Sequence, residues 1–404
     1  MPVFLFIHIP NSLIVFMKRI ALFAVILLLT AKGMAQKNWK ELFDKRYSEI
    51  CTSTETMREI SLKRSASGDS YDFMVISNIL DALQCMYLST GEKIYLNDLI
   101  MIIDNILSTA QVSKEIPGNI YPHKDNYLSW TSKNRFSDYN NEAVLYEGYI
   151  FRYITLLMYH LHQSGWANLS AENQSWYNQT LHFIEKNVWE KWITRSNRTN
   201  GRPYTIFLRS RTHMGAHNAM IAFFLKEITT DPVIKTQCTE LYNMYDLLLK
   251  RNLKSNPAIP QAYIWNSTWD DVSGTQALPV NSTAIQDVAH GNHVLSYVTT
   301  SKKFGNTNWS DKEIDSLCNT VRLVIFNKEE ISFFNVVDGS YSPDILRHRG
   351  NYQAEGWIKL SWFNQETWDF YINFAFRGEQ IIRLEQDMEL QYYANLLYTA
   401  YLRK

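Results

Sequence analysis

The stretch YDFMVISNILDALQCMYLSTGEKIYLNDLIMIIDNIL, residues 71–107, contains two apolar segments separated by a short polar turn. On both sides of Ser89-Thr90-Gly91, apolar residues recur at spacings of three and four, which is the period of an amphipathic helix. The Ser-Thr-Gly turn interrupts that period and is a typical helix stop. The stretch therefore predicts a helical hairpin.

The same helical period recurs along most of the chain after residue 36. It predicts helices over 39–64, 70–90, 93–109, 141–163, 171–190, 212–228, 232–251, 283–300, 310–327, 351–377 and 386–402. Asp231-Pro232 and the Ser310–Glu313 segment are start signals for two of these helices. No Gly/Ser-rich linker divides the chain, so we expect residues 36–404 to form one domain.

Helical hairpins that repeat every roughly 60–80 residues can form an open solenoid or close into a ring. The loops expected at 114–140, 193–211, 252–282 and 328–350 are long and irregular, which favours the ring. We therefore predict an all-α protein, an alpha/alpha toroid that is an incomplete or closed barrel of about six to seven hairpins. Long loops of this kind often carry functional residues.

The N-terminal residues have the pattern of an export signal. Met17-Lys18-Arg19 is basic, residues 20–31 are apolar, and Gly33-Met34-Ala35 is a small-x-small cleavage pattern. We predict a signal peptide over residues 1–35, with Met17 as an alternative start, and a signal anchor as the competing interpretation. The expected location is the bacterial periplasm or the medium, without membrane attachment after cleavage.

The chain has 40 basic and 40 acidic residues, which argues against nucleic acid as its main partner. An anionic substrate remains compatible, because it needs only a local group of cations. The 12 Trp and 24 Tyr suit carbohydrate binding but also suit a core. Cys51, Cys85, Cys238 and Cys318 contain no CxxC pair, and the sequence leaves open whether they form disulfides. The oligomeric state is likewise left open.

Several segments resemble successive hairpins of toroid carbohydrate enzymes. They are residues 71–107 and the segments EAVLYEGYIFRYITLLMYHL, THMGAHNAMIAFFLKEI, DVAHGNHVLSYV and NYQAEGWIKLSWF. Within that group the chain most resembles polysaccharide lyases that act on uronic-acid polymers, of the alginate and glucuronan lyase kind. The resemblance implies an anionic polysaccharide as substrate, no cofactor, and β-elimination by tyrosine and histidine with asparagine and arginine helpers.

β-Elimination needs a group that neutralises the uronate carboxylate, a base for the C5 proton, and an acid for the leaving oxygen. Three segments offer such groups at the expected starts of helices. Asp287 lies one helical turn before His290 and can orient it, while Tyr297 lies deeper and suits a supporting role. The candidate catalytic residues are His213, His217, Asn218, His290, Arg349 and Tyr352.

Candidate substrate-binding residues are cations and aromatic rings near the same helix starts or in the long loops. Each also has an ordinary structural interpretation: a histidine can be a core residue, and a loop arginine can be solvated. The candidates are Arg135, Tyr139, Arg211, Trp265, Trp269, His293 and Arg347.

Three other functions compete with the lyase. A zinc site could use the four histidines, but there is no HExxH motif, and we expect no metal. A glycoside hydrolase on the same toroid, acting for example on unsaturated uronides, would need paired carboxylates. Candidates for such pairs are Glu142, Glu147, Asp270, Asp271, Asp287 and Glu355. A glycan-binding protein without catalysis is the third alternative.

Overall fold

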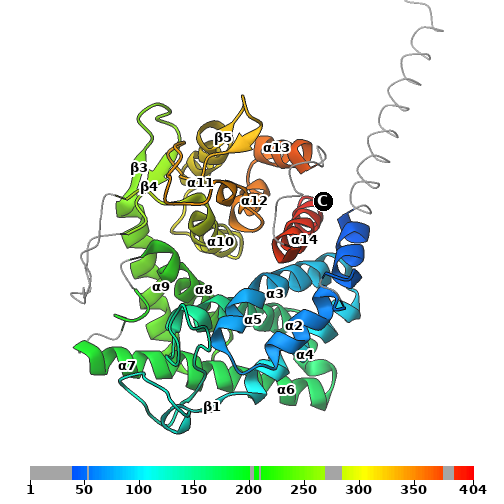
Figure 1. The fold of residues 1–404 in the computed structure, drawn as a ribbon, viewed down its shortest axis with the longest axis vertical. Coiled ribbons are helices and arrows are strands. Elements are labelled where there is room, and N and C mark those ends of the chain that lie inside the picture. Colours follow the sequence, from blue (N-terminus) through cyan, green and yellow to red (C-terminus); the bar gives the residue numbers. More distant parts are fainter. Residues whose placement is uncertain (1–38, 52–53, 201–203, 209–210, 269–283, 376–385) are drawn as a thin grey trace, which may run out of the picture.

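Six helices form a closed inner ring in the computed structural model, which describes residues 39–51, 54–200, 204–208, 211–268, 284–375 and 386–404. Each inner helix packs on the next one, and the last packs back on the first (Figure 1). In chain order they are α3 (Ser70–Thr90), α5 (Val144–Gln163), α8 (Thr212–Ile228), α10 (Val288–Lys303), α12 (Gly356–Lys359) and α14 (Gln386–Leu402). The predicted all-α toroid is confirmed.

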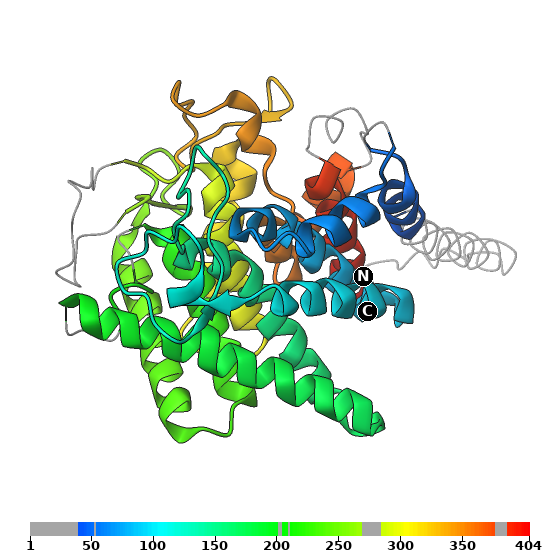
Figure 2. The same ribbon diagram turned by 60° about the horizontal axis from the view of Figure 1, so that its bottom comes forward.

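The remaining helices lie outside this ring. Besides the helical residues 39–48, they are α2 (Met57–Ser65), α4 (Lys93–Ser108), α6 (Ala171–Phe183), α7 (Lys191–Asn200), α9 (Pro232–Asn252), α11 (Asp311–Asn319) and α13 (Gln365–Ala375). A π-helical segment, η3 (Ile184–Glu190), joins α6 to α7, and Figure 2 shows the three as one long helix along the outside of the ring. Inner and outer helices alternate along most of the chain, which is the hairpin repeat expected from residues 71–107.

The predicted helix boundaries follow from capping residues. Gly91 ends α3 with a left-handed φ of 72°, a conformation that glycine adopts without strain. The Ser310 side chain and Glu313 form the expected capping box at α11. The Asp231 side chain accepts from the first backbone amides of α9, which has proline at its first position.

Three small antiparallel hairpins occupy the long loops. They pair β1 (Gln111–Val112) with β2 (Leu128–Ser129), β3 (Leu253–Ser255) with β4 (Tyr263–Trp265), and β5 (Phe326–Asn327) with β6 (Ser332–Phe333). Each pair lies between an outer helix and the next inner helix. The elaborated loops therefore meet the ring at the end where inner helices begin.

The segment expected to be one helix over 351–377 is instead divided. A 3-10 turn, η5 (Arg347–Asn351), is followed by the four-residue α12, a second 3-10 turn, η6 (Leu360–Trp362), and then α13. Gly356 lets α12 touch α10, since a Cβ atom there would overlap the backbone of Asn292 and Ser296. Close packing at a glycine has no signature in helical periodicity.

The centre of the ring holds a buried charge network, by which we mean Asp81, Arg152, Glu355 and Lys359. All four side chains are at most 2% exposed. Lys359 Nζ lies 3.2 Å from Asp81 Oδ1 and 3.4 Å from Glu355 Oε1, and Arg152 lies 3.1 Å from Glu355 Oε2. Burial opposes the charge on Glu355, but Arg152 and Lys359 outweigh it and hold the pKa of this carboxyl below its usual value.

Two further expectations from the sequence concern the N-terminal signal peptide and the cysteines. The predicted signal peptide lies outside the described residues and stays a prediction. In the part of the chain that is described, no helix is both long and apolar enough to cross a bilayer. All four cysteines are free thiols, and Cys85, Cys238 and Cys318 are buried.

Candidate functional site

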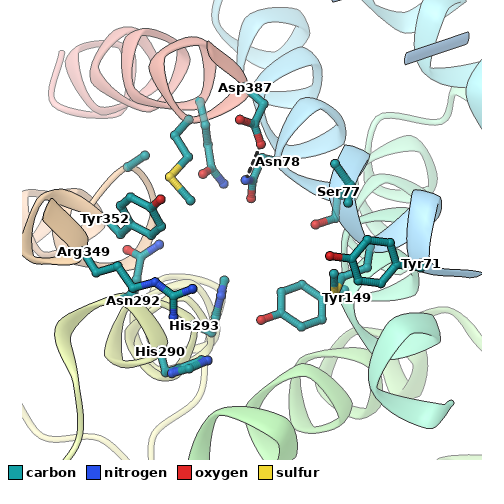
Figure 3. A pocket seen from close by; sticks show the side chains of 16 residues that line it. Tyr71, Ser77, Asn78, Tyr149, His290, Asn292, His293, Arg349, Tyr352 and Asp387 are labelled. Carbon is teal, nitrogen blue, oxygen red and sulfur yellow. Dashed lines mark hydrogen bonds between the residues drawn. The ribbon is translucent and has the colours of Figure 1, made fainter. Parts of the chain in front are cut away.

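A cavity of about 280 Å³ opens where the inner helices begin (Figure 3). Its walls come from the first turns of α3, α10 and α14, from Tyr149 on α5, and from the segment before α12. The lining residues are Tyr71, Met74, Val75, Ser77, Asn78, Tyr149, Ala289, His290, Asn292, His293, Arg349, Tyr352, Ala354, Asp387, Met388 and Gln391. We call this cavity the central pocket. The positive ends of several helix dipoles meet around it, which favours an anionic ligand.

Asp287 holds His290 at the wall of the central pocket. One carboxylate oxygen of Asp287 caps α10 by accepting from the His290 backbone amide at 2.9 Å. The other lies 2.7 Å from His290 Nδ1, so this ring nitrogen donates to the carboxylate. Burial alone would raise the pKa of Asp287, but the hydrogen bond and charge of His290 lower it. His290 Nε2 is the ring nitrogen left for a ligand.

His213 and His217 lie behind the pocket wall rather than on it. The ring of His213 stacks on His290 with centroids 4.1 Å apart. His217 lies 4.0 Å from the ring of Tyr149 and 5.0 Å from that of His293. Burial lowers the pKa of both well below the usual histidine value, so both rings are neutral. Their contacts support the pocket rings.

His293 and Tyr149 complete this side of the pocket. Arg152 places a guanidinium nitrogen 3.3 Å from His293 Nδ1. Burial, followed by the charge of Arg152, lowers the pKa of His293 well below its usual value. Burial raises the pKa of Tyr149 to about 12, so its hydroxyl is protonated at neutral pH.

Arg349 and Tyr352 contribute a cation and a further phenol to the pocket (Figure 3). The Nε atom of Arg349 is buried and has no hydrogen-bond partner among the described residues. Arg347 lies in the same 3-10 turn, and its side chain is outside the described part of the structure. The structure therefore brings four of the predicted site residues, His290, His293, Arg349 and Tyr352, together in one pocket.

The opposite wall carries residues that the sequence prediction missed. Asn78 Nδ2 donates to Asp387 Oδ2 at 2.9 Å, and both face His290 and Arg349 across the pocket (Figure 3). Gln391 lies one turn beyond Asp387 on α14. No spacing pattern links Asn78 on α3 to Asp387 and Gln391 on α14, and the only sequence signal is that Asp387 follows a predicted helix start.

Other predicted site residues lie away from the pocket. Arg135 and Tyr139 are exposed on the loop before α5, and Arg211 is exposed at the start of α8. Asn218 is buried and donates to the carbonyls of Phe207 and Met214. These positions are not in contact with the central pocket.

The two tryptophans expected to bind sugar have different outcomes. Trp265 is 1% exposed and stacks on Trp357, with ring centroids 6.0 Å apart. It is a core residue rather than a sugar platform, because β4 pairs with β3 and turns this side chain inward. Trp269 lies outside the described residues.

Three of the candidate carboxylates for hydrolysis form buried ion pairs within the protein. Glu142 pairs with Arg195, Glu147 with Lys191, and Glu355 belongs to the buried charge network. Asp270 and Asp271 lie outside the described residues. Among the described residues, no group of three or more His, Cys, Asp or Glu side chains is arranged to hold a metal ion.

No protein-family model and no curated protein matches the chain. Solved structures of the GH76A alpha-1,6-mannanase of Salegentibacter sp. HEL1_6 do match. An inactive variant in complex with alpha-1,6-mannotriose has a TM-score of 0.51 at 14% identity, covering 92% of this chain and 99% of that chain. A second inactive variant, in complex with alpha-1,6-mannotetrose, has a TM-score of 0.50 at 13% identity with the same coverage. At such identities the match establishes the shared toroid fold.

The expectation of a carbon–oxygen lyase is wrong, because the matching solved toroids are glycoside hydrolases. The resemblance rested on polar residues at the starts of repeating inner helices. Any toroid that opens its pocket at those helix ends places polar residues there, whichever bond it cleaves. The pattern therefore identified the architecture and not the reaction.

Proposed function

We propose that the chain is a glycoside hydrolase that binds one sugar unit of a polysaccharide in the central pocket. The observation that carries this proposal is the placement of proton-transfer groups on two opposite walls. Asp387 on α14 faces His290 on α10 across the pocket (Figure 3), and Asp287 holds His290 from behind through Nδ1. The matching toroid hydrolases, one of them bound to a mannose trisaccharide, support the same reaction class.

Hydrolysis of a glycosidic bond needs an acid that protonates the leaving oxygen and a base or nucleophile on the other side of the sugar. Asp387 supplies a carboxylate on one wall. On the other wall, Asp287 accepts from His290 Nδ1, so that Nε2 can accept or deliver a proton. A sugar between the two walls would have one such group on each side.

Arg349 supports an acidic sugar as the bound unit. Its guanidinium lines the pocket, and no ion pair of Arg349 occurs among the described residues. Arginine pairs with carboxylates through two parallel hydrogen bonds, which fixes both charge and orientation. We propose a uronic-acid unit, saturated or unsaturated, with its carboxylate toward Arg349 and away from Asp387.

A second acid–base candidate lies in the loop expected over 252–282, which carries Tyr263, Trp265 and Trp269 and which we call the aromatic loop. The names of the matching mannanase structures state that two adjacent aspartates were substituted in the inactive variants. This chain has one pair of adjacent aspartates, Asp270-Asp271. The pair is outside the described residues, so its role is assigned by experiment only.

The proposal is tested by measuring reducing ends released from alpha-1,6-mannan and from uronic-acid oligosaccharides, together with the ultraviolet absorbance of unsaturated uronides. We expect hydrolysis of an acidic substrate and a loss of at least about 100-fold in kcat for Asp387→Asn and His290→Gln. Arg349→Gln should raise KM for acidic substrates and leave neutral ones unchanged. Asp311→Asn, at a side chain 92% exposed on α11, is the matched control.

Two results would contradict the proposal in different ways. Absence of hydrolysis of every sugar by the wild type would refute the reaction class. Full activity of both Asp387→Asn and His290→Gln, with loss of activity in Asp270→Asn or Asp271→Asn, would move the acid and base to the aromatic loop.

A further inference from the structure

His293 and Gln391 both line the central pocket and both contact the buried charge network, and we call these two residues the pocket floor. The links run from Gln391 to Asp81, Lys359, Glu355, Arg152 and finally His293. Both ends of this chain of contacts line the central pocket. The network therefore controls how each end residue can present its hydrogen-bonding atoms.

The guanidinium of Arg152 fixes the tautomer of His293. Arg152 has only donors, and it lies 3.3 Å from His293 Nδ1, so that nitrogen must accept. Glu355 Oε2 is 3.9 Å from the same nitrogen, which is beyond hydrogen-bonding distance, and it already pairs with Arg152. A neutral imidazole that accepts at Nδ1 carries its proton on Nε2.

The carboxylate of Asp81 fixes the amide of Gln391. An ionised carboxylate only accepts, so the Gln391 NH₂ group must face Asp81, where Nε2 and Oδ2 are 2.9 Å apart. Asn395, one turn further along α14, donates to the same oxygen at 2.8 Å. The Oε1 atom of Gln391 is left as the acceptor, and no described residue donates to it.

We propose that the pocket floor is a hydroxyl-reading subsite of fixed polarity, in which His293 donates from Nε2 and Gln391 accepts at Oε1. The assignment of a sugar as ligand rests on the proposed function. One hydroxyl of the bound sugar accepts from His293, and another donates to Gln391. Asp81 and Arg152 are positioning residues. With the other tautomer of His293, an N–H at Nδ1 would face the donors of Arg152. With the Gln391 amide turned round, its oxygen would face the carboxylate of Asp81.

Nitrogen NMR of protein labelled with ¹⁵N-histidine tests, without any ligand, which ring nitrogen of His293 carries the proton. His293→Gln identifies the His293 signals. We expect His293 to be neutral with its proton on Nε2 at neutral pH, both in the wild type and in Arg152→Lys, which keeps a charged donor. A proton on Nδ1, or a charged ring, would overturn the assignment.

Calorimetric titration tests whether the pocket floor binds sugar hydroxyls. The probes are alpha-1,6-mannotriose and trigalacturonic acid, and the parent protein is the Asp387→Asn variant. Adding Gln391→Met removes the acceptor but leaves Asp81 paired with Lys359 and Asn395. We expect about tenfold weaker binding of the probe that binds, and unchanged binding when Asp311→Asn, the exposed control on α11, is added instead.

The outcomes separate the two proposals. Unchanged affinity in Gln391→Met refutes the hydroxyl-reading subsite while the hydrolase stands. If neither probe binds any of these proteins, the assignment of the central pocket to a sugar is refuted. The NMR spectrum still shows which ring nitrogen of His293 carries the proton.

Discussion

Replacing Lys359 by methionine tests whether the buried charge network stabilises the ring. Lys359 Nζ contacts Asp81 on α3 and also Glu355, which lies four residues earlier at the start of the same helix. Methionine fills much of the same volume without the charge. Breaking a fully buried ion pair by removing one partner costs about 3–5 kcal/mol.

The remaining contacts place the expected cost at the low end of that range. After the substitution, Glu355 keeps Arg152 and the Ser296 hydroxyl. Asp81 keeps the side-chain amides of Gln391 and Asn395. Neither carboxylate is left bare, so we expect Lys359→Met to lower the free energy of unfolding by about 3 kcal/mol.

Urea unfolding followed by far-ultraviolet circular dichroism measures this cost. Lys186→Met is the matched control, because Lys186 forms an i,i+4 pair with Glu190 in which both side chains are more than 40% exposed. Exposed pairs of this kind contribute about 0–1 kcal/mol. If the two substitutions cost the same, the network does not stabilise the ring and the reasoning is refuted.

Three further predictions concern other buried groups. His217 is fully buried, and neither ring nitrogen has a partner among the described residues, so His217→Phe should keep or raise stability by about 1 kcal/mol in urea unfolding. Because burial depresses the pKa of His217 in the folded state, the unfolded chain takes up the proton first, and the folded state loses stability as pH falls below about 6.5. His217→Phe should lessen this loss of stability. An unchanged pH dependence of the unfolding free energy would contradict this prediction. Gly356→Ala should lower the unfolding free energy by about 3 kcal/mol or prevent folding, since the added Cβ would meet the α10 backbone at Ser296, and a normal urea midpoint would show that the contact is looser. Tyr297→Phe should cost about 1 kcal/mol by removing a 2.9 Å bond to buried Asp246, and a larger loss in thermal unfolding would reveal a wider role.

Helical periodicity and capping residues predicted most of the fold. They fail around α12, where the expected helix is divided into short segments and Gly356 allows a close approach of two backbones. They also misjudge Trp265, because an aromatic residue in a loop gives no sign that a short strand will turn it into the core.

The site was predictable where its partners are near in sequence. Asp287 and His290 are three residues apart, and the expected contact between them is present. Asn78 and Asp387 are 309 residues apart, and only closure of the ring makes them neighbours. No local pattern carries that information, so one wall of the pocket was missed, and with it the carboxylate of Asp387, to which the proposed hydrolysis assigns a role.

Closure of the ring also has a kinetic consequence. The contact between α3 and α14 joins an early segment of the domain to its last inner helix, and such distant contacts are slow to form. The central pocket has walls from both helices, so any state of the chain in which α14 is not docked on α3 lacks a complete pocket.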